Sequence, residues 1–511
     1  MIRIYKILLS VLLVMSGLYC SASKAKKAKT ENRKERFKLQ LQGVKTGNKK
    51  SKFKKLYDKK LKRVRYFDDK VIVKFKTNTK KSVVKRYMLK NNLEPILKLG
   101  KRTYSCQVRD SVDHPEEILK ILVSEGMSQE AFPGHQTEED AALVEIDIDE
   151  YREVLTNGKR SRRRNRLKQA QLHRSQWHLR NSGQAGSVEG ADINVDDAWK
   201  FSKGLGVKVA VIDTGFDLKH LDINYYSEGY DISTDKVGAK APSRSRENHG
   251  TAVAGIIAAL DNDKGVVGVA PKSQIIPIRL LTDDGMVSIS QIIAAHRKAV
   301  ELGADIINDS WGSYDPTLAK GQSLNLTSLE KALYQELEEE ANDGRGVVVI
   351  FASGNSGKSN FNNAPEARNP YTLSVGATNS KDQRASYSLY GAELDLVAPG
   401  GDDNAGIVTT DRKDLKIRKN GKKKRQVLGY SKGNFATSFT GTSAAAPVVS
   451  GVAALVWSIN PNLTARQVKE ILRLSARKDL NKKYKFTSEK NSELGYGIVD
   501  AGAAVRLAMQ Y

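Results

Sequence analysis

The spacing of hydrophobic residues changes part way along this chain. From Gln176 onward, short and almost continuously apolar segments alternate with helix-like patterns such as "SISQIIAAHRKAVELG". The apolar segments read "GVKVAVIDTG", "SQIIPIRLL", "ADIINDSWG", "GVVVIFASGN", "YTLSVGA" and "AELDLVAPG". Such runs are typical of strands buried on both faces, and their alternation with helices favours a mostly parallel sheet with helices on both faces. The sequence therefore predicts an α/β domain over residues 176–511.

A second and smaller unit is predicted over residues 67–135. In "DDKVIVKFKTN" apolar and polar residues alternate as in a half-buried strand, and a helical stretch, the strand "RTYSCQV", a second helical stretch and the short segment "MSQEAFPG" follow. This order predicts a small α+β domain. Residues 23–66 are rich in lysine with little apolar periodicity, which predicts a disordered or weakly helical segment. Residues 136–175 show no clear core and are expected to form a linker.

The first 22 residues have the pattern of a secretory signal peptide. Arg3 and Lys6 precede an apolar run from Ile7 to about Leu18, and small residues lead to a plausible cut after Ala22. The run is too short for a permanent transmembrane helix. We therefore expect an exported protein without a transmembrane anchor.

The formal net charge of +26 is concentrated in the N-terminal third. Residues 23–166 carry a net +19, and residues 167–511 only +5. The run "GKRSRRRNR", Gly158–Arg166, allows two interpretations: an arm that contacts an acidic partner, or an exposed site for cleavage. The basic segment has no interleaved aromatic residues and no recognised reading motif, so it supports non-specific contact at most and no specific nucleic-acid partner.

The chain has two cysteines, Cys20 in the signal-like segment and Cys106. The domain over residues 176–511 has none, so disulfides contribute nothing to its stability. We expect an exported domain of this kind to rely on a large core, a bound metal or both.

Three junctions of the α/β domain present reactive side chains. Asp213 ends the apolar strand "AVID", His249 begins a helix in "NHGTAVAG", and Ser443 follows a Gly-Thr turn in "SFTGTSAAAPVVSG". A serine hydroxyl needs a base to take its proton, and that base needs a carboxylate to orient it and to offset its charge. Asp213, His249 and Ser443 supply one group of each kind.

These blocks resemble the subtilase family of subtilisin-like serine proteases, over residues 176 to about 508. In "IFASGNSG", Asn355 matches the asparagine whose amide donates to the oxyanion in this family. The resemblance implies a secreted serine endopeptidase that acts on proteins or peptides through an Asp-His-Ser triad. An inactive subtilase-like protein, and a basic protein that binds surfaces or nucleic acid, are the alternatives.

The resemblance also assigns substrate and metal positions. Two segments match the edge strands that hold a substrate backbone: Ser310, Trp311 and Gly312, and Ala352, Ser353 and Gly354. The loop "LDNDKGVVGVAP" resembles the family's calcium loop. It implies a structural Ca²⁺ bound by the carbonyls of Leu260, Lys264 and Val266, the side chains of Asn262 and Asp222, and Asp192 to complete the shell.

The start of the domain, "QWHLRNSGQAGSVEGADINVDDAW", resembles the kexin and furin type of subtilase, which cleaves after basic residues. Asp315 falls where that group places an acidic pocket residue, and Glu366 is a candidate for the opposite wall. Thr214 stands where that group usually has a second aspartate. The 68 residues after Ser443 are expected to leave no room for the β-sandwich domain that follows the catalytic domain in that group. Basic preference and broad specificity therefore both stay open.

The N-terminal third fits the family as a propeptide. The 67–135 domain resembles the part that acts as a folding chaperone and intramolecular inhibitor, which predicts a zymogen, expected to be monomeric, that is activated by cleavage within Arg160–Arg166. A second basic run, Lys416–Gln426, is expected to form an exposed hairpin that offers a nicking site or a contact for an acidic partner.

Overall fold

The computed structural model describes part of the N-terminal third and nearly all of the rest of the chain. The described residues are 42–46, 49–58, 63–67, 70–75, 84, 88, 93–100, 103–108, 143–148, 151–154 and 172–511, except 244, 246, 263, 284, 316, 317, 319–321, 360, 420, 421, 428, 432, 479–483, 485 and 487. The signal-like segment 1–22, the arginine run Gly158–Arg166 and the second helix and last segment predicted for the small domain lie outside these residues. The chain divides into two units, Met1–Asp68 and Asp69–Tyr511.

The first unit contains three antiparallel strands, β1 (Gln42–Thr46), β2 (Lys49–Asp58) and β3 (Arg63–Phe67). The expectation of disorder or weak helix over residues 23–66 is wrong for this part of the segment. Tyr57 stands opposite Val64, and Lys55 opposite Tyr66. Aromatic and β-branched residues favour strands, and here they recur among lysines whose charge dominated the sequence-based interpretation.

The second unit begins with a four-stranded antiparallel sheet in the order β5-β6-β4-β7. Its strands are β4 (Lys70–Phe75), β5 (Leu93–Gly100), β6 (Thr103–Val108) and β7 (Leu143–Ile148). The sequence correctly predicts β4 and β6. It misses β5 and β7, and the domain boundary at 135 is too early, because β7 pairs with β4. The alternation of Val144, Ile146 and Ile148 with acidic residues is a strand pattern that the linker interpretation overlooked.

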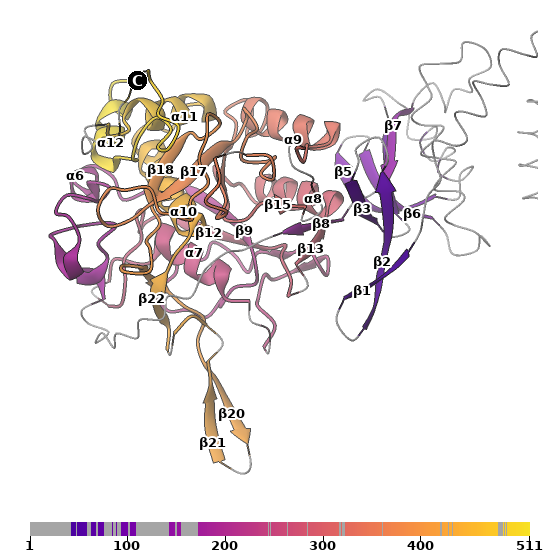
Figure 1. Cartoon of the computed structure of the whole chain (residues 1–511), viewed down its shortest axis with the longest axis horizontal. Helices are drawn as coiled ribbons and strands as arrows, with labels where there is room; N and C mark the ends of the chain where they lie inside the picture. The colour runs from indigo at the N-terminus through magenta and orange to yellow at the C-terminus, as the bar shows by residue number, and fades with distance from the viewer. Residues whose placement is uncertain are drawn as a thin grey trace, which may run out of the picture. The chain divides into compact units, whose positions relative to one another are not determined.

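An eight-stranded sheet forms the centre of the second unit, in the order β11-β10-β12-β9-β14-β16-β17-β18 (Figure 1). All neighbours are parallel except β10 and β11. The strands are β9 (Lys208–Asp213), β10 (Tyr230–Asp231), β11 (Lys236–Val237), β12 (Gln274–Arg279), β14 (Ile306–Asp309), β16 (Val348–Ala352), β17 (Leu373–Thr378) and β18 (Leu396–Pro399).

Helices cover both faces of this sheet. Alternate residues of β9 belong to two separate cores: Val209 and Val211 pack with one group of helices, and Ala210 and Ile212 with the other. The first group comprises α6 (Val195–Trp199), α7 (His249–Ala258), α10 (Thr442–Ile459), α11 (Ala465–Leu474) and α12 (Ala501–Ala508), and the second α8 (Ile289–Glu301) and α9 (Ser328–Glu339). The predicted α/β architecture is confirmed.

The remaining elements are short. They are β8 (Tyr151–Val154), two 3₁₀ turns at His173–Ser175 and Gln184–Gly186, β13 (Met286–Ser288), β15 (Ser313–Tyr314), β19 (Ile407–Thr410), β22 (Phe435–Phe439) and the hairpin of β20 (Leu415–Lys419) and β21 (Lys422–Gln426). The predicted hairpin is present and projects from the ribbon in Figure 1. Strand β8 pairs antiparallel with both β13 and β15.

Helix α10 is long and apolar enough to span a membrane, but 89% of that window is buried within the protein. Its side chains pack against β14, β16 and β17, which is typical of the central helix of a folded core.

Candidate active site

Asp213 and His249 form a buried pair. Asp213 is the last residue of β9, and His249 is the first of α7. The Nδ1 of His249 lies 2.9 and 2.8 Å from the two carboxylate oxygens of Asp213, whose side chain is fully buried. The Asp213 carboxylate also accepts from the backbone N–H of Thr214 at 2.6 Å. The pairing of His249 Nδ1 with Asp213 holds the imidazole with its other nitrogen, Nε2, directed away from the aspartate.

The start of α7 is held close to β9 by a glycine. A Cβ at Gly250 would lie 2.7 Å from the Thr214 carbonyl oxygen and 2.9 Å from the ring of Phe216. The Gly250 N–H instead donates to the Thr214 hydroxyl at 3.0 Å. The glycine after His249 therefore lets the helix approach the strand closely enough to pair the histidine with Asp213.

Ser443 is the second residue of α10, after a Gly441 whose φ is +131°. Its hydroxyl donates to the Ser310 carbonyl at 2.8 Å, and the Ser310 hydroxyl donates to the Ser443 carbonyl at 3.1 Å. Among the described residues, the buried Nε2 of His249 has no hydrogen-bond partner. The structure thus brings the serine to the first strand segment predicted to hold substrate, and leaves the histidine nitrogen able to accept a proton.

Asn355 contacts the first residue of the same helix. Its Oδ1 accepts from the backbone N–H of Thr442 at 2.9 Å and from the Thr442 hydroxyl at 3.1 Å. An amide held through its oxygen directs its NH₂ group the opposite way. This amide, which the resemblance assigns to an oxyanion, therefore lies next to the helix start that carries the Ser443 N–H.

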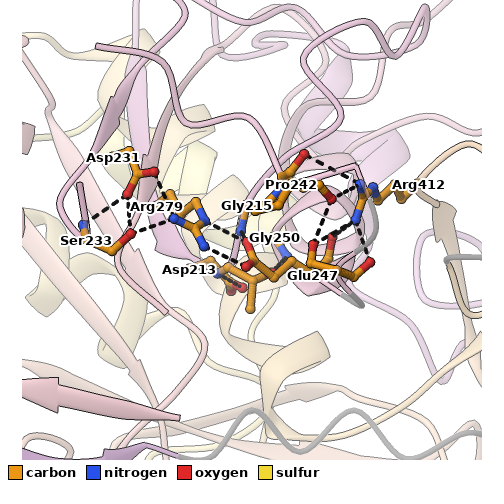
Figure 2. Close-up of polar contacts among 12 residues, drawn as sticks. Asp213, Gly215, Asp231, Ser233, Pro242, Glu247, Gly250, Arg279 and Arg412 are labelled. Atoms are coloured by element: carbon orange, nitrogen blue, oxygen red, sulfur yellow. Dashed lines mark hydrogen bonds and ion pairs between the residues drawn. The ribbon is translucent and has the colours of Figure 1, made fainter. Parts of the chain in front are cut away.

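A network that the sequence did not predict supports the loop before His249 (Figure 2). Arg279, the last residue of β12, stands in register with Asp213. Its guanidinium donates to both oxygens of Glu247, at 2.7 and 2.6 Å, and to Asp231 at 2.8 Å. The same Glu247 carboxylate accepts from the Gly215 N–H at 2.9 Å. These carboxylates raise the pKa of Arg279, which stays charged.

Arg412 holds the same loop from its other side, as Figure 2 shows. Its guanidinium donates to the backbone carbonyls of Pro242, Ser245 and Glu247. The loop that presents His249 is thus fixed by two buried arginines. A charged residue at the end of an otherwise apolar strand, as at Arg279, is the sequence feature that could have indicated this network.

The predicted substrate segments take different positions. Ser310, Trp311 and Gly312 connect β14 to β15, but the Trp311 side chain is buried in the core, where its indole N–H donates to the Ile212 carbonyl at 2.8 Å. Only the backbone of this segment is therefore offered to a substrate. Of the second segment, Ala352 ends β16, Ser353 pairs through its N–H with Val375, and the Gly354 N–H donates to the Thr442 hydroxyl at 3.2 Å.

The two acidic pocket candidates make different contacts. Asp315 follows β15, and its backbone exchanges hydrogen bonds with the Asn363 side chain, both at 3.3 Å. Glu366 is fully buried and accepts from the backbone N–H and hydroxyl of Ser313. It lies 3.9 Å from the guanidinium of Arg152 in β8.

The predicted calcium loop brings most of its assigned residues together. Asp222 accepts from the Asn262 amide at 3.0 Å and from the Val266 N–H at 3.3 Å, and the Lys264 N–H donates to the Asn262 Oδ1 at 3.0 Å. The backbone of Leu260 donates to the Asp222 carbonyl at 3.0 Å. Burial raises the pKa of Asp222, and within the described part of the chain no lysine or arginine pairs with it. A buried carboxylate beside the Asn262 amide, in a loop that also carries backbone carbonyls, fits a hard cation such as Ca²⁺.

Asp192 is engaged elsewhere. Its carboxylate accepts from the N–H groups of Asn181 and Asn194, at 2.7 and 2.8 Å, and its carbonyl accepts from Arg477. Burial raises its pKa as well. The structure shows no contact between Asp192 and the Asp222 loop among the described residues.

Comparisons with known proteins agree with this geometry. Residues 204–497 match the family described as the Subtilase family. Calcium-dependent proteases of Trichormus variabilis and Nostoc sp. are each 33% identical over 359 residues, which is 67% of this chain and 52% of the relative, so the chain spans about half the length of these relatives. Subtilisin BL of Lederbergia lenta is 34% identical over 304 residues, 59% of this chain and 92% of that protein.

Two solved structures share the fold. The serine protease of Aeromonas sobria, in a complex with the chaperone ORF2, has a TM-score of 0.56 and 26% identity over 69% of each chain. Fervidolysin from Fervidobacterium pennivorans, described as a keratinolytic enzyme related to subtilisin, has a TM-score of 0.61 and 22% identity over 86% of this chain and 61% of that one. The second likeness concerns the fold alone.

Proposed function

Because the chain belongs to the subtilase family, we propose that it is a serine endopeptidase that cleaves peptide bonds in protein or peptide substrates. The observation that carries this proposal is the buried contact of His249 Nδ1 with Asp213, which leaves Nε2 available beside the helix that presents Ser443. No position of the triad is altered, which favours an active enzyme over an inactive relative.

Each residue has a defined role in the proposed reaction. His249 takes the proton of the Ser443 hydroxyl as the serine attacks the substrate carbonyl, and it later gives that proton to the leaving amine. Asp213 holds the imidazole in one tautomer and stabilises its positive charge. The Asn355 amide and the Ser443 N–H donate to the oxyanion that forms on the carbonyl oxygen. The resulting acyl-enzyme is hydrolysed by water that His249 activates in the same way.

The test is hydrolysis of a protein substrate such as casein, and of a peptide library, by the purified chain and by Ser443→Ala. The variant is expected to lose all detectable cleavage. Ser458→Ala, at the other end of α10, is the matched control and should keep it. Cleavage retained by Ser443→Ala refutes the triad. An inactive wild-type chain instead supports the alternative hypothesis of a subtilase-like protein without activity.

We further propose that the chain is exported and made as a zymogen, with the N-terminal third as its intramolecular inhibitor. The pairing of β8 with β15, directly after the Ser310–Gly312 segment, supports this, because a strand in that position competes with substrate. Activation then requires cleavage after β8, and the arginine run at Arg160–Arg166 is the proposed site. N-terminal sequencing of the mature form tests it, and a mature start far outside residues 160–176 would contradict it.

Two properties of the proposed enzyme concern its ligands. A structural Ca²⁺ would be held by Asp222, Asn262 and the carbonyls of Leu260, Lys264 and Val266, where it offsets the buried carboxylate and fixes the loop. Asp315 is proposed to favour a basic residue before the scissile bond. If the Asp315 side chain does not reach that pocket, we expect broad specificity. A cleavage profile of the mature enzyme distinguishes basic preference from broad specificity.

A further inference from the structure

Arg152 of β8 is buried in the α/β domain, although it lies in the N-terminal third of the chain. Only 3% of the surface of Arg152 is exposed. Its Nη1 donates to Glu330 Oε1 at 2.7 Å and its Nη2 to Glu330 Oε2 at 3.1 Å, so the guanidinium and the carboxylate form a two-point contact. Residues this far apart in sequence meet only because β8 inserts between β13 and β15.

The pocket that receives this guanidinium is built from several elements of the α/β domain. Glu330 is fully buried in the first turn of α9, and Glu366 lies 3.9 Å from the Arg152 Nη1. The Asn325 carbonyl accepts from the Arg152 Nη2 at 3.4 Å. Ser313 of β15 holds Glu366 through its N–H and hydroxyl. We call Glu330, Glu366 and the Asn325 carbonyl the arginine pocket.

The charges of the arginine pocket favour a cation. Two buried carboxylates repel each other and lose hydration, so an empty pocket would be unfavourable. Burial raises the pKa of Glu366, and the Arg152 charge opposes that rise. A guanidinium presents a planar pair of N–H donors that matches a carboxylate, which an ammonium group cannot do.

The position of the pocket connects it to the active site. Val154 pairs with Ser313, and Glu153 with Tyr314, so β8 runs antiparallel to β15 and its chain direction leads toward Ser310. Ser310 is the residue whose carbonyl accepts from the Ser443 hydroxyl. The Val154 N–H also donates to the Gly285 carbonyl at 2.8 Å, next to β13. A peptide that extends to Ser443 and pairs with the same two strands would place one side chain where Arg152 lies.

We propose that the arginine pocket is a substrate subsite that selects an arginine about five residues before the scissile bond, because Ser310 lies three ladder steps beyond the Val154–Ser313 pair and Arg152 lies two residues before that pair. In the full chain Arg152 fills the pocket and anchors β8. Once the N-terminal third has left, the guanidinium of a substrate takes its place. The selection of substrates rests on the proposed peptidase function, whereas guanidinium binding does not.

The first experiment scans peptides with the processed wild-type enzyme. One position before the scissile bond is varied at a time among arginine, lysine, citrulline and alanine. Arginine is expected to raise kcat/KM about 10- to 100-fold over alanine and citrulline at one position, since a charge-assisted two-point contact discriminates by that amount. Lysine should lie between them.

The variants are Glu330→Gln and Glu366→Gln. Glutamine at position 330 preserves the capping box that Glu330 forms with Thr327 at the start of α9, so the helix should remain intact. Each variant should lose most of the arginine preference, measured as the ratio of kcat/KM for the arginine peptide to kcat/KM for the alanine peptide. Glu336→Gln, on an exposed turn of the same helix, is the control and should keep the preference. An enzyme that cleaves these peptides without preference for arginine at any of these positions overturns the proposal.

A second experiment does not depend on catalysis. The double variant Ser443→Ala, Arg152→Ala leaves the pocket without its own guanidinium, and ethylguanidinium is added as the probe. The melting temperature is expected to rise by about 2 °C at saturation, and the rise should vanish when Glu330→Gln is added. A rise alongside an inactive wild-type chain would refute peptidase function but keep the pocket, and the absence of any rise would refute the pocket.

Discussion

Thr442 and Asn355 are joined by two hydrogen bonds, because the backbone N–H and the hydroxyl of Thr442 both donate to the Asn355 Oδ1. This contact decides which side of the amide faces the serine. The oxygen is occupied, so the NH₂ group is the part of Asn355 that can meet a developing negative charge. The residue before the proposed nucleophile thus orients the amide that sequence motifs assign to Asn355 alone.

Replacement of Asn355 by leucine is expected to lower kcat about 10²- to 10³-fold with little change in KM, because the donor acts on the transition state. Thr442→Val keeps the backbone donor and loses the hydroxyl, so it should lower kcat by roughly tenfold. Steady-state kinetics on one peptide substrate measure both effects. Thr442→Ser retains the hydroxyl and should behave like wild type, and an equal loss in Thr442→Ser would show that the hydroxyl is not the cause.

The network of Arg279 is expected to stabilise the whole domain. Arg279→Met leaves Glu247 and Asp231 buried without their cation, which should lower the free energy of unfolding by about 3–5 kcal/mol. Urea unfolding in a Ser443→Ala background, which prevents self-digestion, measures this loss.

Arg297→Met is the matched control for that measurement. Arg297 pairs with Glu336 on the surface, with side chains 34% and 41% exposed, so its loss should cost only about 0–1 kcal/mol. Similar losses in the two variants would show that the Arg279 network adds nothing beyond an ordinary surface pair.

The sequence predicts those parts of the protein that depend on local pattern. Apolar runs predicted most strands of the central sheet, and three short motifs at element ends identified Asp213, His249 and Ser443 as the candidate triad. Within the small domain the same criterion failed at β7, because acidic residues between Val144, Ile146 and Ile148 made a strand resemble a linker.

Long-range ion pairs leave no such pattern. Nothing near Arg152 in the sequence points to Glu330, and Glu330 has a sufficient local explanation in the capping box of α9. The pairing becomes visible only when β8 is placed against β15. Trp311 illustrates the same limit, since its motif assigns the segment to substrate binding but does not show that its side chain packs in the core.

Asp411 is expected to make stability depend on pH. Asp411 directly follows β19, and its side chain is fully buried. Burial raises its pKa to about 7, although the N–H groups of Arg412 and Ser431 donate to the carboxylate and oppose the rise. A folded pKa above the unfolded value of about 4 means that the folded state binds the proton more tightly. The contribution is therefore fully present below pH 4 and is lost as the pH rises toward 7, by up to about 4 kcal/mol.

Asp411→Asn cannot ionise and should remove this dependence. Unfolding free energies at pH 4, 5, 6 and 7, again with Ser443→Ala, should show wild type losing stability relative to the variant across that window. Asp261→Asn, at an exposed pair with Lys203, is the control and should follow wild type. Parallel curves for wild type and Asp411→Asn would place the pKa of Asp411 in its usual range.

Calcium is expected to stabilise the domain through the loop at Asp222. Chelation with EDTA should lower the melting temperature of the wild-type domain by about 5–10 °C, as expected for a site that is saturated well above its dissociation constant. Asp222→Asn removes the one carboxylate of the proposed set, so it should abolish the response to both EDTA and added Ca²⁺.

Asp192→Asn tests whether Asp192 is also a calcium ligand. Because the Asp192 carboxylate is already held by the N–H groups of Asn181 and Asn194, its variant should keep the calcium response, and a lost response would return Asp192 to the ligand set.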